Sequence, residues 1–126
     1  MVKFKAKHDS GYWLTAELSN DGNDNYGIMW HGQNGDEPFA RINPNTICVA
    51  TGLRDSNGAD IYVGDLLKVT DDETGSEIYG VSVWFEKSAY VVHFPYGMGS
   101  TTLFELLMRD GKTVVVQGNR LDDIDC

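Results

Sequence analysis

Cysteine, histidine and proline are all scarce in this chain of 126 residues, and long hydrophobic runs are absent. The two cysteines, Cys48 and Cys126, lie far apart, which predicts neither a disulfide framework nor a zinc site. Cys48 stands in an apolar run and is expected to be a small buried side chain. No apolar run approaches the ~20 residues of a membrane span, and the N-terminus lacks the apolar core of a signal peptide. These absences predict a soluble, cytoplasmic protein without a membrane partner.

Positive charge is also in short supply. The chain has 19 acidic and 10 basic residues, which gives a net charge of −9. A field of this sign repels phosphate backbones, so nucleic acid is not the expected partner. The simplest reason for the excess of acids is solubility.

Glycine, in contrast, is abundant, with 14 residues. Many glycines predict many turns and hence short strands, and the chain length suits a single domain over residues 1–126. Alternating apolar and polar residues indicate a lysine-faced strand at 2–7 and a hairpin formed by 78–85 and 90–94. Further strands are expected at 12–18, with Trp13 in the core, and at 46–50, 66–70 and 114–117. A short apolar segment spans 26–30, and an irregular excursion covers 31–44.

The segment 102–108 fits two structures. Thr102 and Glu105 have the spacing of a capping box, which predicts a short helix through Met108. The following Asp110-Gly111 pair suits either the end of a helix or a tight hairpin turn. The sequence leaves helix and strand open here.

The clearest structural pattern lies at residues 51–69. Asp55-Ser56-Asn57-Gly58 predicts a tight turn, and Gly64-Asp65 predicts a second reversal before a buried strand. This stretch resembles the signature of the YopX-like family of phage and prophage proteins. The matching residues are Thr51-Gly52-Leu53, Asp55, Asn57-Gly58, Ile61-Tyr62 and Gly64-Asp65-Leu66.

Weaker matches extend the resemblance towards both ends. Lys3-Phe4-Lys5-Ala6, with Trp13, is similar to the opening strand of the family, and Val115-Val116-Gln117-Gly118-Asn119 is similar to its closing segment. The chain departs from the family at Val116 and Gln117, at His8 and in lacking the aromatic residue after Asn119. The resemblance implies a mostly β domain from a mobile genetic element, in the cytoplasm of a bacterial host. It carries over no catalytic residues.

The expected fold is mainly β, a small SH3-like or partly open β-barrel with additional N-terminal strands and long loops. The strand Gly-Asp-Leu-Leu-Lys-Val, followed by Val-Ser-Val-Trp-Phe, is similar to SH3-like barrels, which is an analogy of fold alone.

No constellation for catalysis stands out, so we expect no enzyme, cofactor or metal. His8, His31 and His93 lie in separate segments without metal-ligand spacing. The acidic residues of the signature, Asp55, Asp60 and Asp65, could form a carboxylate cluster, but turn aspartates more often bind their own backbone. Asp21, Asn23 and Asn25 begin a calcium-loop pattern that fails at Tyr26 and Gly32.

The sequence therefore favours a phage or prophage accessory protein that acts through contacts with a host or phage protein. One alternative is an acidic mimic of DNA that blocks a host nucleic-acid-binding protein. Another is a single-strand nucleic-acid-binding barrel that uses Trp30, Trp84 or Tyr96. Apolar residues in loops suggest an interaction surface at Tyr96, Met98, Asp36 and Phe39, and strand edges make a homo-oligomer an expectation as well.

Overall fold

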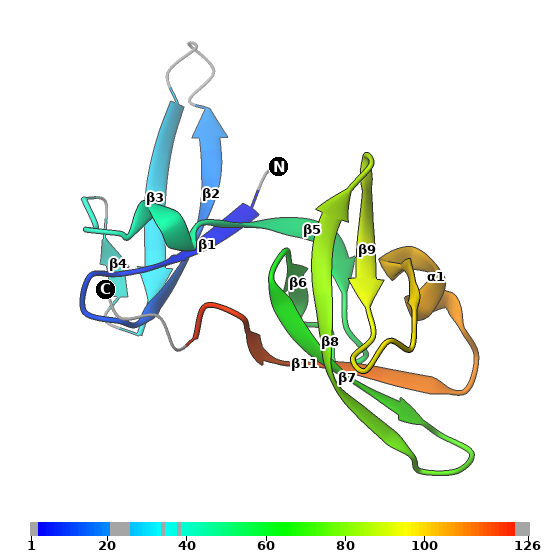
Figure 1. The fold of residues 1–126 in the computed structure, drawn as a ribbon. Helices are drawn as coiled ribbons and strands as arrows, with labels where there is room; N and C mark the ends of the chain where they lie inside the picture. Colours follow the sequence, from blue (N-terminus) through cyan, green and yellow to red (C-terminus); the bar gives the residue numbers. More distant parts are fainter. Residues whose placement is uncertain (1–2, 21–25, 34, 38, 123–126) are drawn as a thin grey trace. The chain divides into compact units, whose positions relative to one another are not determined.

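A computed structural model of the chain describes residues 3–20, 26–33, 35–37 and 39–122, which form two compact units. The first unit extends to Ala50, and the second runs from Thr51 to Asp122 (Figure 1). Each unit has its own cluster of buried hydrophobic residues. The single domain over residues 1–126 stays a prediction. The calcium pattern at Asp21, Asn23 and Asn25 lies outside the described residues.

The first unit is built on an antiparallel sheet with the strand order β4-β3-β2-β1-β5. Its elements are β1 (Lys3–Lys7), β2 (Trp13–Asn20), β3 (Tyr26–Gly32), β4 (Gly35–Glu37), the 3-10 turn η1 (Pro44–Thr46) and the beginning of β5 (Cys48–Arg54). The core lies on one face, because alternate strand residues point the same way. It contains Ala6, Leu14, Ala16 and Trp30.

The other face of this sheet differs from the expected solvated row of lysines. Lys7 lies opposite Trp13 in the register and is buried, and Trp13 is half-buried and not part of the core. The Nζ atoms of Lys5 and Lys7 lie 4.8 and 5.8 Å from the centre of the Trp13 ring. A lysine can bury its alkyl stem on an aromatic ring, so alternation alone overstated the exposure of Lys7.

The second unit contains a five-stranded antiparallel sheet with the order β10-β9-β8-β7-β11, and β6 lies beside β5. After the end of β5, its elements are β6 (Asp60–Tyr62), β7 (Asp65–Asp71), β8 (Glu77–Glu86), β9 (Ala89–His93), β10 (Ser100–Thr102), α1 (Leu103–Met108) and β11 (Lys112–Asn119). The predicted hairpin is confirmed by β8 and β9, in which Val83 lies opposite Val92 and Phe85 opposite Tyr90.

The two faces of this sheet have different burial. Leu67, Val69, Val81, Val83, Val92 and Val114 are buried on one face. Neighbouring residues on the other face, such as Lys68, Ser82 and Trp84, are only half-buried. This alternation places the core of the second unit on the side that α1 covers, because Leu103 and Leu106 belong to the same cluster.

The ambiguous segment is a helix. The Thr102 side chain caps α1 by accepting a hydrogen bond from the Glu105 backbone N–H, at 3.1 Å. Burial of Leu103 and Leu106 stabilises a helix that is too short to form alone. Conversely, β4 lies in the excursion that was expected to be irregular, because Gly35–Glu37 pairs with β3.

The fold is therefore mainly β, as predicted. The described strands close no barrel, and the partly open form of the expected fold is the one that fits. The only α-helix among the described residues is α1, and no described helix is long and apolar enough to cross a membrane.

Candidate functional site

The signature turn of the second unit is organised by the carboxylate of Asp55. Its Oδ1 accepts hydrogen bonds from the backbone N–H groups of Asn57 and Ala59, each at 2.9 Å. Its Oδ2 accepts a third, also at 2.9 Å, from the N–H of Val116 in β11. Asp55 thus shapes its own turn, as predicted, and also attaches this turn to the last strand.

Asp65 plays the same kind of part at the second reversal. It is fully buried, and its carboxylate accepts hydrogen bonds from the backbone N–H of Tyr62 and from Nδ2 of Asn119, at 2.8 and 2.9 Å. Gly64 has a φ of +94°, which favours glycine, and a Cβ there would lie 3.3 Å from Asn119 Nδ2. Residues 64–66 of the signature and residues 115–119 of the closing segment, which are far apart in the sequence, therefore meet in space.

The three signature aspartates are each engaged in a separate structural contact. Asp55 and Asp65 bind backbone groups, and Asp60 forms an ion pair with Arg54, in which Nε and Oδ1 are 3.4 Å apart. Carboxylates used in this way are not available as a shared acid–base pair. The turn role expected for Asp55 and Asp65 is confirmed.

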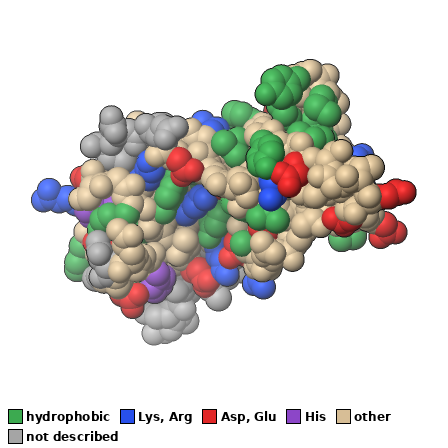
Figure 2. Space-filling view, turned by 90° about the horizontal axis from the view of Figure 1, so that it is seen from below, with side chains coloured by type: hydrophobic (Ala, Val, Ile, Leu, Met, Phe, Trp, Pro, Cys, Tyr) green, Lys and Arg blue, Asp and Glu red, His purple; other side chains and the backbone are tan. Residues whose placement is uncertain are grey.

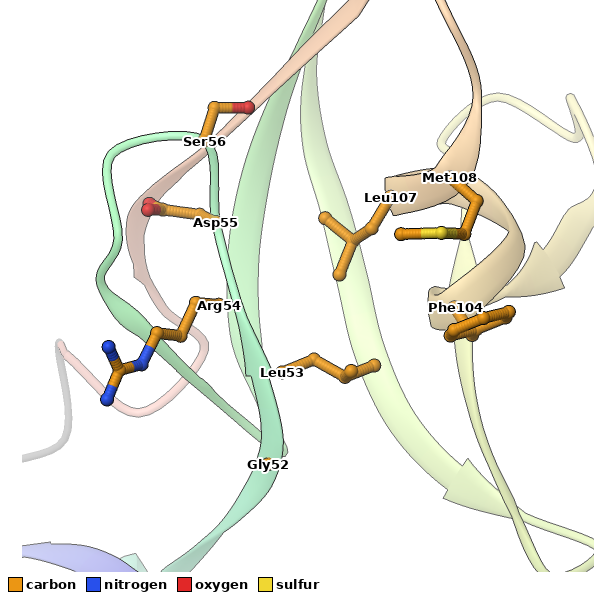
Figure 3. A pocket seen from close by; sticks show the side chains of 8 residues that line it. All are labelled: Gly52, Leu53, Arg54, Asp55, Ser56, Phe104, Leu107 and Met108. Atoms are coloured by element: carbon orange, nitrogen blue, oxygen red, sulfur yellow. The ribbon is translucent and has the colours of Figure 1, made fainter.

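Beside the signature turn lies a groove between β5 and α1, with a volume of about 310 Å³. We call it the β5–α1 groove, and it is lined by Gly52, Leu53, Arg54, Asp55, Ser56, Phe104, Leu107 and Met108. Figure 3 shows Leu53 and Leu107 pointing towards each other across it, whereas the Arg54 and Asp55 side chains point away from the helix. Leu53 and Leu107 make this part of the groove apolar, whereas the strand wall also contributes polar surface.

The helix wall of the groove is exposed. Phe104, Leu107 and Met108 have the spacing of one helix face, and Phe104 and Met108 are each more than half exposed. Apolar side chains of this size in a concave site are typical of contacts with apolar parts of a partner. The strand wall adds Arg54, which forms an ion pair with Asp60.

The residues expected to form an interaction surface fall into two separate pairs. Tyr96 and Met98 belong to the second unit, in the loop between β9 and β10, and Tyr96 is 98% exposed with a φ of +60°. Asp36 and Phe39 belong to the first unit, where Asp36 is in β4 and Phe39 is 95% exposed. The four positions do not form one site within either unit, and their part in binding stays a prediction.

Each histidine lies near a carboxylate. His31 Nδ1 is 2.6 Å from Asp36 Oδ1, and His93 Nε2 is 2.8 Å from Glu86 Oε1. His8 stacks on Tyr12 and places Nε2 3.7 Å from Glu37 Oε1. No group of three or more His, Cys, Asp or Glu side chains that could hold a metal ion occurs in the described part of the chain.

The tryptophans expected to serve as stacking platforms have different surroundings. Trp30 is buried in the core of the first unit, with its ring against Phe4. Trp84 is half-buried, donates a hydrogen bond from Nε1 to Ser82 Oγ at 2.8 Å, and lies under the guanidinium of Arg120. Both rings already have protein contacts, which leaves Tyr96 as the freest of the three proposed aromatic residues.

Two titratable groups of the second unit are shifted by local hydrogen bonds. The pKa of Asp71 lies below its ordinary value of 3.8, chiefly because Lys112 Nζ donates to Oδ2 at 2.8 Å and secondarily because the N–H groups of Thr74 and Glu73 donate to Oδ1. The pKa of Tyr79 lies above 10.0, because its hydroxyl donates to the Glu77 carboxylate. Both groups lie at the exposed end of the β7–β8 hairpin, and their hydrogen bonds are structural contacts.

Sequence reasoning missed the β5–α1 groove. A signal was present, because the capping box predicts a helix on which Phe104 and Met108 share a face with Leu107. What the sequence could not supply was the opposite wall, because Leu53 lies about fifty residues earlier in the chain.

A protein-family model described as YopX protein matches residues 3–123 of the chain, nearly its full length. No curated protein matches the sequence.

Proposed function

The chain belongs to the YopX protein family, and from this premise we propose that it is a phage or prophage accessory protein that binds another protein and catalyses no reaction. The observation that carries the proposal is the β5–α1 groove, in which the exposed Phe104 and Met108 of the helix wall stand opposite Leu53 of the strand wall. The partner would be a host or phage protein in the bacterial cytoplasm. An apolar segment of that partner would fill the space between Leu53 and Leu107.

The groove supports binding because its exposed apolar side chains gain free energy when a partner buries them. Burying a phenylalanine or methionine side chain is worth about 1.5–3 kcal/mol, so Phe104 and Met108 together could act as the energetic centre of an interface. The expectation of a non-enzymatic role is supported by Asp55, the acidic residue of the groove lining, because its carboxylate already accepts three backbone hydrogen bonds.

The two nucleic-acid alternatives have less support. Figure 2 shows several acidic side chains gathered at the right end of the view and single ones elsewhere among basic and hydrophobic side chains. A DNA mimic requires acids in a phosphate-like array, and a single-strand binder requires cations around exposed aromatic rings. Both stay alternatives to be tested by binding experiments.

A photo-crosslinking experiment in the bacterial host tests the proposal. A benzophenone amino acid at Phe104 should crosslink the chain to one defined protein, whereas the same residue at Phe85 should not. The two positions are matched, because both are phenylalanines of the second unit and their exposures are 57% and 58%. The substitution Phe104→Ala should abolish co-purification of that protein, and Phe85→Ala should preserve it.

Equal crosslinking from both positions, or co-purification that survives Phe104→Ala, would contradict the groove as the contact site. Labelled single-stranded oligonucleotides at low salt provide the parallel test of the alternative. Tight, salt-dependent binding would replace protein contact by nucleic-acid contact as the proposed function.

A further inference from the structure

The signature turn contains a pair of residues that is chemically reactive. In Asn57-Gly58 the backbone nitrogen of the glycine can attack Cγ of the asparagine, because glycine has no side chain that hinders the approach. The turn itself requires this glycine, since Gly58 has a φ of +83°. The backbone conformation of the turn therefore selects the residue that makes the preceding asparagine reactive.

The reaction is a deamidation, and water is its only co-reactant. The Gly58 nitrogen, after giving its proton to solvent base, forms a bond to Asn57 Cγ. The bond from Cγ to the side-chain nitrogen breaks, and ammonia leaves with a proton from solvent. Water then opens the resulting succinimide ring at either carbonyl, which leaves aspartate or isoaspartate at position 57, and nothing is oxidised or reduced.

Solvent access does not protect this pair. Asn57 and Gly58 are both exposed, and a Cβ at Gly58 would have no atom within 4 Å beyond its chain neighbours. Within the part of the chain that the structure describes, the Asn57 side chain forms no hydrogen bond. Water and the attacking nitrogen can therefore reach Cγ, so any protection must come from the backbone.

The backbone of the pair is held by hydrogen bonds to Asp55. Three successive N–H groups donate to this one residue: those of Asn57 and Ala59 to Oδ1, each at 2.9 Å, and that of Gly58 to the carbonyl oxygen at 3.0 Å. The attacking nitrogen is thus engaged, and so are the N–H groups on both sides of it. It must leave its partner and turn towards Cγ before it can react.

The charge of Asp55 opposes the reaction as well. Attack requires the Gly58 amide without its proton, which is an anion, and the N–H groups that flank it both bind the Asp55 carboxylate. Like charges repel, and more strongly where burial lowers the effective dielectric constant; Asp55 is 7% exposed. Backbone geometry and charge therefore act in the same direction.

We propose that Asn57 is a latent deamidation site: Asp55 keeps it unreactive in the folded turn, and opening of the turn releases it. Isoaspartate adds one backbone carbon between positions 57 and 58, so the N–H groups of Gly58 and Ala59 no longer fit the oxygens of Asp55 together. An opened turn that has reacted cannot close as before, and its attachment to Val116 is weakened. The site does not depend on a partner in the β5–α1 groove.

Peptide mapping of the full chain by mass spectrometry tests the inference. Trypsin releases residues 55–68, in which Asn57 is the one asparagine, and an isoaspartyl methyltransferase labels the isoaspartate product. At mildly alkaline pH, Asn57 should convert at least about tenfold more slowly in the folded chain than in guanidinium chloride, the factor expected for one hydrogen bond to a charged group. Equal rates in the two states would overturn the proposal.

The chain supplies an internal reference for the unfolded rate. Asn34-Gly35 is its other Asn-Gly pair. In guanidinium chloride the two pairs should convert at similar rates, because neither is then held by folded structure. If Asn57 stayed at least about tenfold slower than Asn34 in the denaturant, the neighbouring sequence and not the fold would be the source of its protection, and the proposal would be wrong.

Matched substitutions assign the protection to Asp55. In native buffer, Asp55→Ala should bring the conversion of Asn57 close to the unfolded rate. Asp60→Ala removes another signature aspartate, which pairs with Arg54, and should leave the rate low. Circular dichroism shows whether each variant is folded. If Asp55→Ala does not fold, Asp55→Asn replaces it and should accelerate conversion by about threefold, because the amide keeps an oxygen acceptor but loses the charge.

The variants can also contradict the assignment. A folded Asp55 variant in which Asn57 converts as slowly as in the unsubstituted chain would remove Asp55 from the explanation. Equal acceleration in the Asp55 and Asp60 variants would mean that a general loss of stability, and not the loss of the Asp55 contacts, releases Asn57.

Discussion

Single buried side chains account for most of what the signature residues do. Asp65 is the clearest case, because it is fully buried and joins Tyr62 in the reversal to Asn119 at the end of β11. Asp55 joins its turn to Val116 in the same strand. The contacts that each aspartate makes within its own turn were predictable, since aspartate in a reversal accepts hydrogen bonds from nearby N–H groups. The contacts with β11 were not predictable, because spacing along the chain does not reveal which strand packs beside the turn.

Replacing Asp65 by asparagine should destabilise the protein. The amide can offer its oxygen to only one of the two donors, and its own NH₂ then faces the other. We expect the free energy of unfolding to fall by about 2 kcal/mol, measured by urea denaturation followed by circular dichroism. The exposed Asp110→Asn is the control and should stay within about 0.5 kcal/mol. Equal stabilities of the two variants would show that the Asp65 contacts are not needed.

The contact between Asp71 and Lys112 predicts a dependence on pH. The pKa of Asp71 is lowered in the folded protein, chiefly by the Lys112 hydrogen bond, so its contribution to stability is present above its ordinary pKa of 3.8 and is lost as the pH falls. Lys112→Gln should raise the pKa of Asp71 towards 3.8, measured by NMR titration of its carboxyl carbon. Lys87→Gln, in the β8–β9 turn, should leave that pKa where it is. An unchanged pKa in Lys112→Gln would refute the assigned cause.

At the scale of helices and strands, sequence patterns predicted an element correctly where local interactions decided its structure. The β8–β9 hairpin follows from two alternating runs and a turn, and α1 begins where Thr102 and Glu105 form a capping box. The short β4 was missed because Gly-Asp-Glu has low strand propensity. It is a strand because its backbone pairs with β3. Tertiary pairing also decides the exposure of Lys7, which alternation predicted wrongly.

The cap of α1 can be tested directly. Thr102→Ala removes the hydroxyl that accepts the Glu105 N–H and should lower stability by about 1 kcal/mol. Thr102→Ser keeps the hydroxyl and should restore most of this loss. Thermal unfolding of the three proteins makes the comparison. If the alanine and serine variants unfold at the same temperature, the side-chain cap is not what starts the helix.

For the whole molecule, charge and strand edges govern association. The edge strands β4, β6 and β10 have three residues each, and such short edges offer little to another chain. The longer β11 is covered by the signature turn: Ser56 N–H donates to the Val114 carbonyl, and Ser56 Oγ accepts from the Val114 N–H, each at 2.8 Å. The expected homo-oligomer stays a prediction, and among the described edges none favours it.

The net charge of −9 predicts a solubility minimum near the sequence pI of about 4.5. Turbidity at a fixed protein concentration should peak near that pH and fall on both sides. At pH 7, added salt should have little effect on turbidity, because mutual repulsion already keeps the molecules apart. A protein that precipitates at neutral pH and low salt would show that an attractive surface outweighs the charge.

The attachment of the signature turn to β11 has a consequence for synthesis. The hydrogen bonds that Asp55 accepts from Val116 and Asp65 accepts from Asn119 join residues 61 and 54 positions apart. A nascent chain thus emerges from the ribosome with the signature complete but without the strand that it holds. Until β11 follows, one edge of β7 is open, and non-local pairing of this kind is slow to form. Translation pauses or chaperones that act between residues 71 and 119 would therefore influence the yield of folded protein more than those that act earlier.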